Sequence, residues 1–222
     1  DKGKSHASGK LLFNCRVIPN RGSWLDLEYD VKDFLYFKID RKKKINASTL
    51  LMALGLTKSE IADEFYDKDT YSFDAKTGKW KTKFNPENYK AKNFSEEVID
   101  FKTGKVVIKL GEKINFLTAK KLFNEGLKDI LVSKESLYGK YLHKSVKVND
   151  EEEGTFGIGT ELNDTIINQI LEAKISSIEI SITNSINKGP YLLNTILNDK
   201  NNNKNDAITE IYKVLRPGEP PT

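Results

Sequence analysis

Three parts of this 222-residue sequence combine residue types that could bind a polyanion. Trp24 directly follows Gly22-Ser23, where an aromatic ring could serve as a platform for a stacked nucleic-acid base. The run Arg41-Lys42-Lys43-Lys44 follows an apolar segment and could contact phosphates, giving affinity without sequence information. Arg216 precedes Pro217 in a proline-rich loop, and because proline fixes φ, this loop should hold the guanidinium in place.

Each of these features also has a simpler structural interpretation. An isolated tryptophan after a turn is more often a core anchor, and a run of charges is usually a solvated surface. The loop around Arg216 could be a linker. A nucleic-acid function therefore depends on the features occurring together.

The sequence contains no recognisable catalytic set. It has no Ser–His–acid arrangement and no Asp-x-Asp-x-Asp metal triad. The segment Gly154-x-x-Gly157-x-Gly159 lacks the Lys-Ser/Thr of a P-loop and the G-x-G-x-x-G order of a dinucleotide site, which favours a flexible loop. His6 and His143 have no carboxylate or cysteine at ligand spacing, so no metal site is predicted.

Composition is that of a soluble chain with a mild positive charge. Hydrophobic residues make up 38% of the chain, enough for a core, and the net charge of +4 permits a polyanionic partner without requiring one. No run of 18 apolar residues occurs, and no apolar signal region follows the N-terminus, so we expect no membrane contact and a cytoplasmic location. The single cysteine, Cys15, lies in the apolar run Leu11–Ile18, which favours a buried structural thiol over a reactive one.

The elements that position these residues are predicted from hydrophobic periodicity. Three segments have the pattern of strands: Leu11–Ile18, Trp24–Tyr29 and Phe34–Ile39. The last two should form a hairpin through Asp30–Asp33. Two strand-like pieces follow further along the chain, around Tyr71–Phe73 and Trp80–Phe84.

Helical spacing and capping signals predict four helices in the outer parts of the chain. The first covers Ala47–Leu56, with Asn46 as its cap and Gly55 at its end. Thr57 and Glu60 form a capping box that begins the second, which runs through Phe65. The other two are predicted near the C-terminus, over Tyr191–Leu197 and Ala207–Leu215.

An internal repeat with an offset of 48 residues lies in the middle of the sequence. Its first copy is Ile114-x-x-x-Thr118-Ala119-x-x-Leu122, then Leu127-x-x-Ile130-x-Val132. Its second copy is Leu162-x-x-x-Ile166-Ile167-x-x-Ile170, then Ile175-x-x-Ile178-x-Ile180. In both copies the period changes from about 3.6 to 2. The repeat predicts an amphipathic helix before a short strand, twice, in a compact α/β module with pseudo-symmetry.

Taken in order, the motifs resemble the β subunit of bacterial RNA polymerase. The motifs are Ser8-Gly9-Lys10, Ile18-Pro19-x-Arg21-Gly22-Ser23-Trp24-Leu25-Asp26, Ile39-Asp40-Arg41-Lys42-Lys43-Lys44, Gly189-Pro190-Tyr191 and Glu210-Ile211-Tyr212-x-x-x-Arg216-Pro217-Gly218-Glu219-Pro220-Pro221-Thr222. The resemblance is close over residues 1–66 and 189–222 and loose between them. The family often has Arg-Arg-Arg-Lys where this chain has Arg41-Lys42-Lys43-Lys44, so the charge is kept but the guanidinium fork is lost at two positions.

The resemblance implies an α+β fold with a discontinuous domain. Residues 1–66 and 189–222 would form a mixed α+β lobe, and residues 67–188 would form an inserted domain that carries the helix–strand repeat. The lobe would be one jaw of the downstream DNA channel of DNA-directed RNA polymerase, the nucleotidyltransferase of transcription. The chain would therefore be a fragment of an enzyme that carries no catalytic residue itself.

The same resemblance implies roles for individual residues. Trp24 would stack on a nontemplate-strand base near the start site, and Arg216 would contact the same strand in the bubble. Arg41 and Lys42, Lys43 and Lys44 would supply phosphate or inter-domain contacts. Lys10 would line the same channel.

The implied partners are the nontemplate strand and downstream duplex of DNA, the polymerase subunits β′, α and σ, and regulators that dock on the inserted domain. The catalytic Mg²⁺ would be held by β′, so no cofactor is expected in this chain. The acidic run Asp150–Glu153 could dock regulators but more simply keeps the insertion soluble. The alternative function is a protein-interaction module with little DNA contact, whose binding should depend less steeply on salt. An independent hydrolase or nucleotide-binding enzyme would need a catalytic set that the sequence lacks.

Overall fold

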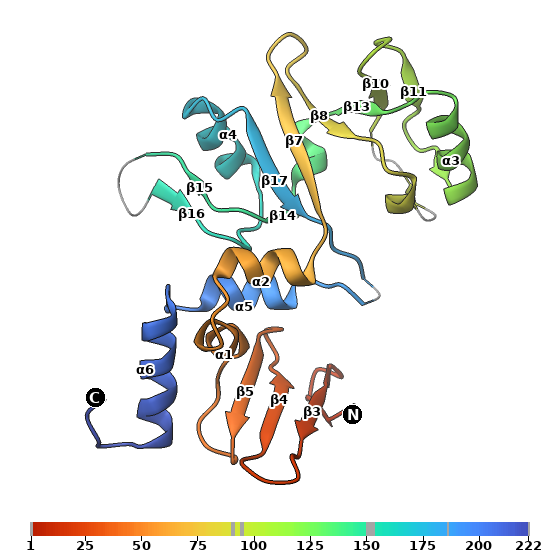
Figure 1. Ribbon diagram of the computed structural model, residues 1–222. Helices are drawn as coiled ribbons and strands as arrows, with labels where there is room; N and C mark the ends of the chain where they lie inside the picture. Colours follow the sequence, from red (N-terminus) through yellow and green to blue (C-terminus); the bar gives the residue numbers. More distant parts are fainter. Residues whose placement is uncertain (1, 90–91, 94–95, 150–153, 186, 222) are drawn as a thin grey trace. The chain divides into compact units, whose positions relative to one another are not determined.

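The computed structural model describes residues 2–89, 92–93, 96–149, 154–185 and 187–221 (Figure 1). The chain divides into two compact units. Unit 1 comprises Asp1–Asp67, Gly157–Thr160 and Thr183–Thr222, and unit 2 comprises Lys68–Phe156 and Glu161–Ile182. Helices and sheets together confirm the α+β class. The division into a lobe of residues 1–66 and 189–222 and an insertion of residues 67–188 stays a prediction.

Unit 1 is built on a four-stranded antiparallel sheet. Its strands, in spatial order, are β3 (Asn14–Val17), β4 (Leu25–Tyr29), β5 (Leu35–Ile39) and β6 (Ile45–Asn46). Strands β4 and β5 form the predicted hairpin, and Asp30 Oδ1 accepts a hydrogen bond of 3.0 Å from the Phe34 amide in its turn. A separate two-stranded sheet pairs β1 (Lys4–Ser5) with β2 (Leu11–Leu12).

The prediction of one strand over Leu11–Ile18 with a buried Cys15 is wrong. The segment divides into β2 and β3, and every residue of β3 is exposed, Cys15 included. The physical reason is that the described part of unit 1 does not cover β3. Its position at the edge of the sheet is not sufficient, because β6 is the other edge strand and its Ile45 is buried. An apolar run therefore did not indicate burial, because burial depends on what packs over a strand.

Among the described residues, unit 1 has four α-helices. They are α1 (Ala47–Ala53), α2 (Lys58–Phe65), α5 (Tyr191–Asn198) and α6 (Lys204–Leu215). The capping box of α2 is confirmed: Thr57 Oγ1 accepts from the Glu60 amide at 3.1 Å, and Glu60 Oε2 accepts from the Thr57 amide at 2.8 Å. Asn46 occupies the N-cap of α1 without a side-chain capping bond, and Gly55, with φ of 112°, follows the end of α1 as predicted.

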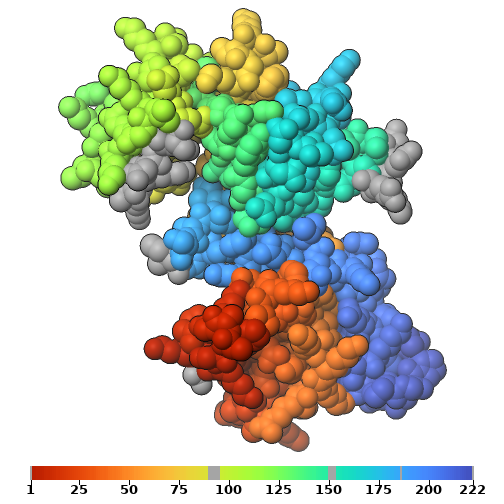
Figure 2. All heavy atoms as spheres, turned by 180° about the vertical axis from the view of Figure 1, so that it is seen from behind, coloured from red at the N-terminus to blue at the C-terminus, as the bar shows by residue number. Residues whose placement is uncertain are grey.

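A buried carboxylate joins the N-terminal and C-terminal parts of unit 1. Asp199 follows α5 and is 4% exposed. Its Oδ2 accepts hydrogen bonds from Ser48 Oγ at 2.5 Å and Thr49 Oγ1 at 2.8 Å, both on α1. Lys58 Nζ donates to the Asp199 carbonyl at 2.8 Å. In Figure 2 the blue C-terminal segment of unit 1 lies against the orange segment that contains α1. These bonds connect positions about 150 residues apart in sequence.

Gly159 fits against the backbone of α5, which requires glycine at this position. Its φ is +88°, and a Cβ there would lie 2.2 Å from the Leu193 carbonyl oxygen. The need for glycine at position 159 is therefore explained by packing against α5, and no phosphate-binding role is needed to explain it. The same packing also explains why residues 157–160 belong to unit 1 although the residues around them belong to unit 2.

Gly159→Ala should therefore lower the free energy of unfolding of unit 1 by more than about 2 kcal/mol, because a left-handed backbone alone costs ~1–2 kcal/mol and the carbonyl contact adds to it. Urea titration followed at Trp24, which lies in unit 1, measures this loss. The control is Gly55→Ala, which also has positive φ but open space around the added Cβ. Equal losses for the two variants would contradict a tight contact at Gly159.

Unit 2 contains a seven-stranded sheet in which each pairing is antiparallel. The order is β11 (Val106–Ile108), β10 (Val98–Asp100), β13 (Asp129–Val132), β8 (Lys79–Lys83), β7 (Lys68–Asp74), β17 (Ser177–Ser181) and β14 (Tyr141–Leu142). Two further pairs are β9 (Lys92–Asn93) with β12 (Lys113–Ile114), and β15 (Val146–Lys147) with β16 (Thr155–Phe156). The α-helices are α3 (Phe116–Asn124) and α4 (Asp164–Glu172), and the 3₁₀ turns are Pro86–Asn88 and Lys134–Leu137.

The predicted helix–strand repeat is confirmed. Helix α3 leads to β13, and α4 leads to β17. Asn115 and Asn163 begin the two helices in the same way, since each side chain accepts a hydrogen bond of 2.9 Å from the amide three residues on. Gly126 and Lys174 both have positive φ after the helix. The two copies share their helix ends as well as their hydrophobic pattern.

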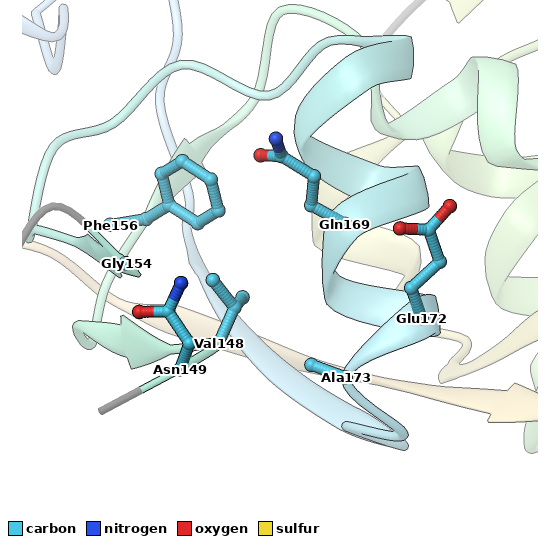
Figure 3. Close-up of a pocket in the computed structure, with 7 residues that line it drawn as sticks. All are labelled: Val148, Asn149, Gly154, Phe156, Gln169, Glu172 and Ala173. Carbon is cyan, nitrogen blue, oxygen red and sulfur yellow. The ribbon is translucent and has the colours of Figure 1, made fainter. Parts of the chain in front are cut away.

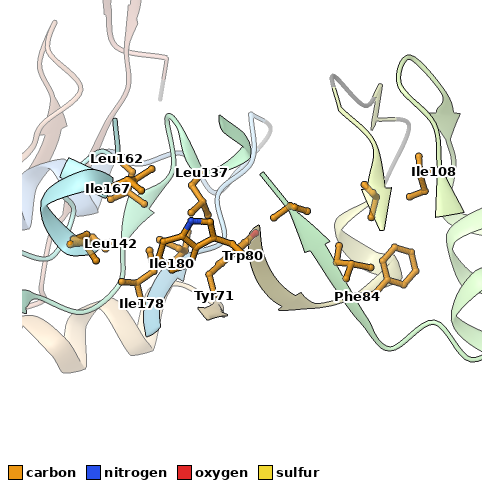
Figure 4. Packing of buried hydrophobic residues seen from close by; sticks show 14 of the residues in the cluster. Tyr71, Trp80, Phe84, Ile108, Leu137, Leu142, Leu162, Ile167, Ile178 and Ile180 are labelled. Atoms are coloured by element: carbon orange, nitrogen blue, oxygen red, sulfur yellow. The ribbon is translucent and has the colours of Figure 1, made fainter. Parts of the chain in front are cut away.

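The core of unit 2 fills the space between the sheet and its helices (Figure 4). Trp80 is fully buried in this cluster, and Figure 4 shows its ring beside Leu137. The only other tryptophan of the chain is Trp24. Each unit therefore contains one tryptophan, which gives each an independent spectroscopic probe.

Candidate nucleic-acid interface

The outer face of the β3–β4–β5 sheet carries a ladder of charged side chains beside Trp24. Because side chains alternate along a strand, Trp24, Asp26 and Glu28 lie on one face. Arg16 on β3 and Lys38 on β5 lie directly opposite Asp26. Arg16 Nε and Nη2 donate to the two carboxylate oxygens of Asp26, the second bond measuring 3.0 Å, and Lys38 Nζ lies 2.7 Å from Glu28 Oε1.

This pairing changes the titration of the Asp26 carboxyl. The hydrogen bond from Arg16 holds the pKa of Asp26 below its ordinary value, and the charges of Arg16, Arg41 and Lys38 act in the same direction. Asp26 therefore stays ionised, and keeps its bidentate contact with Arg16, at pH values below those at which an ordinary aspartate becomes protonated.

Trp24 is partly exposed to solvent, and two guanidinium groups lie near its ring. The residue is 38% exposed, so it is not a core anchor. The Cζ atoms of Arg16 and Arg41 lie 5.1 and 5.7 Å from the ring centroid, within the range of a cation–π contact. Asp40 fixes the backbone beneath the ring: Asp40 Oδ1 accepts from the Trp24 amide at 2.8 Å, and the Asp40 amide donates to the Trp24 carbonyl at 3.0 Å.

Arg41 reaches the ring from a strained turn. The Lys42 amide donates to the Ile39 carbonyl at 3.0 Å, and the two central residues, Asp40 and Arg41, have φ values of 49° and 60°. Positive φ at both positions is typical of a type I′ turn, which usually uses Asn or Gly. A bulky residue held in this region costs of order 1 kcal/mol and is found preferentially at functional positions.

The run Arg41-Lys42-Lys43-Lys44, called the basic turn below, contacts the end of α6. Lys42 Nζ donates to the Leu215 carbonyl at 2.6 Å, where a cation also complements the partial negative charge of a helix C-terminus. The next residue, Arg216, is exposed and lies 3.3 Å from Glu219. Two motifs separated by 173 residues in sequence thus meet.

The remaining predicted residues divide into two groups. Lys43 is exposed on the basic turn, and Lys44 Nζ lies 4.3 Å from the centre of the Tyr36 ring. Lys10 instead pairs with Asp33 at 2.6 Å, at the end of the β4–β5 hairpin away from Trp24. Of the predicted cations, the structure therefore places Arg41 at the Trp24 ring, Lys42 at the end of α6 and Lys44 at Tyr36, with Lys10 apart from all three.

Arg16 and Asp26 were not predicted from sequence as site residues. Neither lies in a run of charges. The available signal was strand alternation, which places Asp26 two residues from Trp24 on the same face of β4. The missing information was the register that sets Arg16 opposite Asp26, which only the pairing of β3 with β4 supplies.

Unit 2 has a separate hollow beside β15, β16 and α4 (Figure 3). Among the described residues that line it, Glu172 is the one charged side chain; they are Val148, Asn149, Gly154, Phe156, Gln169, Glu172 and Ala173. The acidic run Asp150–Glu153 lies outside the described residues. Within the described ranges, no group of three or more His, Cys, Asp or Glu side chains could hold a metal, and no helix is long and apolar enough to cross a membrane.

Comparison with known proteins identifies the family. The family model RNA polymerase Rpb2, domain 2, matches residues 10–153. The chain belongs to this family. The relatives of this Rpb2 domain 2 chain include the DNA-directed RNA polymerase subunit beta of Rickettsia felis and of Rickettsia rickettsii, each 44% identical over 99% of the chain, and that of Rickettsia canadensis, at 43%.

The Rpb2 domain 2 chain spans 16% of the length of these curated relatives. The predicted relationship to the β subunit is confirmed. The family model covers Trp24 and the basic turn, and the pairwise matches extend over 220 residues.

Proposed function

We propose that this chain is a lobe of the β subunit of bacterial DNA-directed RNA polymerase that contacts nontemplate-strand and downstream DNA during transcription. The observation that carries this proposal is the exposed Trp24 ring with two guanidinium groups near it, beside a basic turn that contacts the end of α6 next to Arg216. The enzyme is inferred from the names of the relatives, and the way in which the chain would contact DNA is inferred from the site.

The chemistry of this surface suits a single strand of nucleic acid. An indole ring can stack on any base, because every base has a π-face. Arg41 lies at the ring and Lys43 is exposed on the basic turn, so both can neutralise phosphates. Arg216 is also exposed, and a phosphate would have to compete with Glu219 for its guanidinium. Such a surface holds melted DNA and contributes no step of nucleotidyl transfer.

The surrounding assembly follows from the same proposal. The catalytic Mg²⁺ is held by the β′ subunit, so this segment needs no cofactor. Its partners are DNA and the subunits β′, α and σ, in a cytoplasmic complex. Regulators would dock on the inserted domain.

Salt dependence tests the DNA contact. Lys43→Gln in the complete polymerase should reduce the steepness of promoter binding against salt, measured as log K against log salt, by roughly 0.7–0.9, the contribution of one phosphate contact. Lys188→Gln is the control, because Lys188 pairs with Asp67 at 3.1 Å and lies outside the basic turn. An unchanged slope for Lys43→Gln would favour the alternative of a protein-interaction module.

A further inference from the structure

Arg16 contacts both Asp26 and the Trp24 ring, so the pair Arg16–Asp26 could act on the ring itself. The Arg16 guanidinium makes two hydrogen bonds to Asp26 and also lies 5.1 Å from the Trp24 ring centroid. We propose that Arg16 and Asp26 are positioning residues, which hold the Trp24 ring in a fixed orientation before a base stacks on it. The consequence for base stacking rests on the proposed function, whereas the fixed orientation of the ring does not.

The geometry distinguishes Arg16 from the other cation at the ring. Arg16 extends from β3, and its guanidinium is held by a carboxylate on the neighbouring strand, directly opposite in the register. Arg41 extends from a turn, and its Cζ lies further from the ring, at 5.7 Å. A guanidinium fixed in a two-bond fork has less freedom than one on a turn, so Arg16 is the group that can orient the indole.

Charge neutralisation supports the same assignment. Asp26 offsets the charge of Arg16, and the hydrogen bond between them lowers the pKa of Asp26 and raises that of Arg16. A paired guanidinium is a weaker phosphate ligand than an exposed cation. Arg16 therefore orients the Trp24 ring, while Arg41 and Lys43 are available to bind phosphates.

Orientation before binding matters because an exposed indole could otherwise adopt several rotamers. Fixing the ring in advance removes the cost of ordering it when a base arrives. We expect loss of the pair to weaken base-dependent binding while leaving phosphate-dependent binding intact. A residue needed only for folding would reduce both together.

The orientation can be measured without nucleic acid. In the 222-residue chain labelled with 5-fluorotryptophan, Trp24 and Trp80 should give two ¹⁹F resonances, assigned with Trp24→Phe. Asp26→Asn should shift or broaden the Trp24 resonance and leave that of Trp80 in place. Glu28→Gln is a matched control, since Glu28 lies two residues further along the same face of β4 and pairs with Lys38 at 2.7 Å. An unchanged Trp24 resonance in Asp26→Asn would overturn the proposal.

The consequence for stacking is measured by binding of a short single-stranded oligonucleotide and its abasic counterpart. Asp26→Asn should reduce the affinity ratio of the two at least threefold, with an unchanged salt slope, and Asp26→Glu should restore part of it. A ratio maintained in Asp26→Asn, or lost together with the salt slope, contradicts a positioning role. If the unsubstituted chain shows no base-dependent ratio, the proposed stacking function fails, while the ¹⁹F measurement still decides whether the pair fixes the ring.

Discussion

Replacing Trp24 with alanine in the complete polymerase should shorten the lifetime of the open complex by about fivefold or more. Loss of one base–aromatic stacking contact corresponds to ~1–3 kcal/mol. The dependence of the lifetime on the identity of the nontemplate base near the start site should flatten at the same time, because the residue that senses this base is gone. Dissociation of preformed open complexes, with the base varied at that position, measures both effects.

Two control variants separate stacking from other causes. Trp24→Phe keeps an aromatic surface and should retain part of the lifetime. Phe101→Ala removes another exposed aromatic residue, which lies in unit 2 and is 41% exposed. The centre of its ring is 4.1 Å from Lys81 Nζ, and its loss should leave the open-complex lifetime unchanged. A folded Trp24→Ala enzyme with unchanged lifetime and unchanged base preference would mean that Trp24 only packs against Arg16 and Arg41.

Replacing Asp199 with alanine should destabilise unit 1 by about 3 kcal/mol. The substitution leaves the buried hydroxyls of Ser48 and Thr49 without their acceptor, and an unsatisfied buried donor costs ~1–3 kcal/mol. Because Asp199 joins α1 to the segment after α5, the loss should affect unit 1 as a whole. Urea titration followed at the ¹⁹F resonance of Trp24 reports on unit 1, and that of Trp80 reports on unit 2.

The comparison variants for Asp199 use the same titration. Asp199→Asn keeps one acceptor oxygen and should lose less stability than the alanine variant. Asp67→Asn removes an exposed carboxylate, 79% exposed, that pairs with Lys188 in the same unit, and it should cost less than about 1 kcal/mol. Equal effects of Asp199→Ala and Asp67→Asn would rule out a structural role for the buried contact.

Local patterns in the sequence determined most of the secondary structure. The capping box at Thr57 and Glu60 forms as predicted, because a cap depends on residues within one turn of each other. The helix–strand repeat was also visible, since its hydrophobic positions recur at the same offset in both copies. The five motifs from Ser8 to Thr222, taken together and in order, indicated the family.

Tertiary structure decided burial and the composition of the site. Cys15 lies in an apolar run but is exposed, because the described part of unit 1 leaves β3 uncovered. Lys10 and Lys42 are both lysines in basic surroundings, yet Lys10 pairs with Asp33 while Lys42 binds the end of α6. Nothing within a few residues of either lysine distinguishes these outcomes.

The sequence by itself therefore determined which residues could stack on bases and bind phosphates, because those capacities belong to side-chain types and their immediate neighbours. Only the tertiary structure placed Arg16 beside Trp24 and opposite Asp26, and brought the basic turn to the end of α6 next to Arg216. These contacts depend on strand register and on the packing of segments up to 173 residues apart, which no local pattern records.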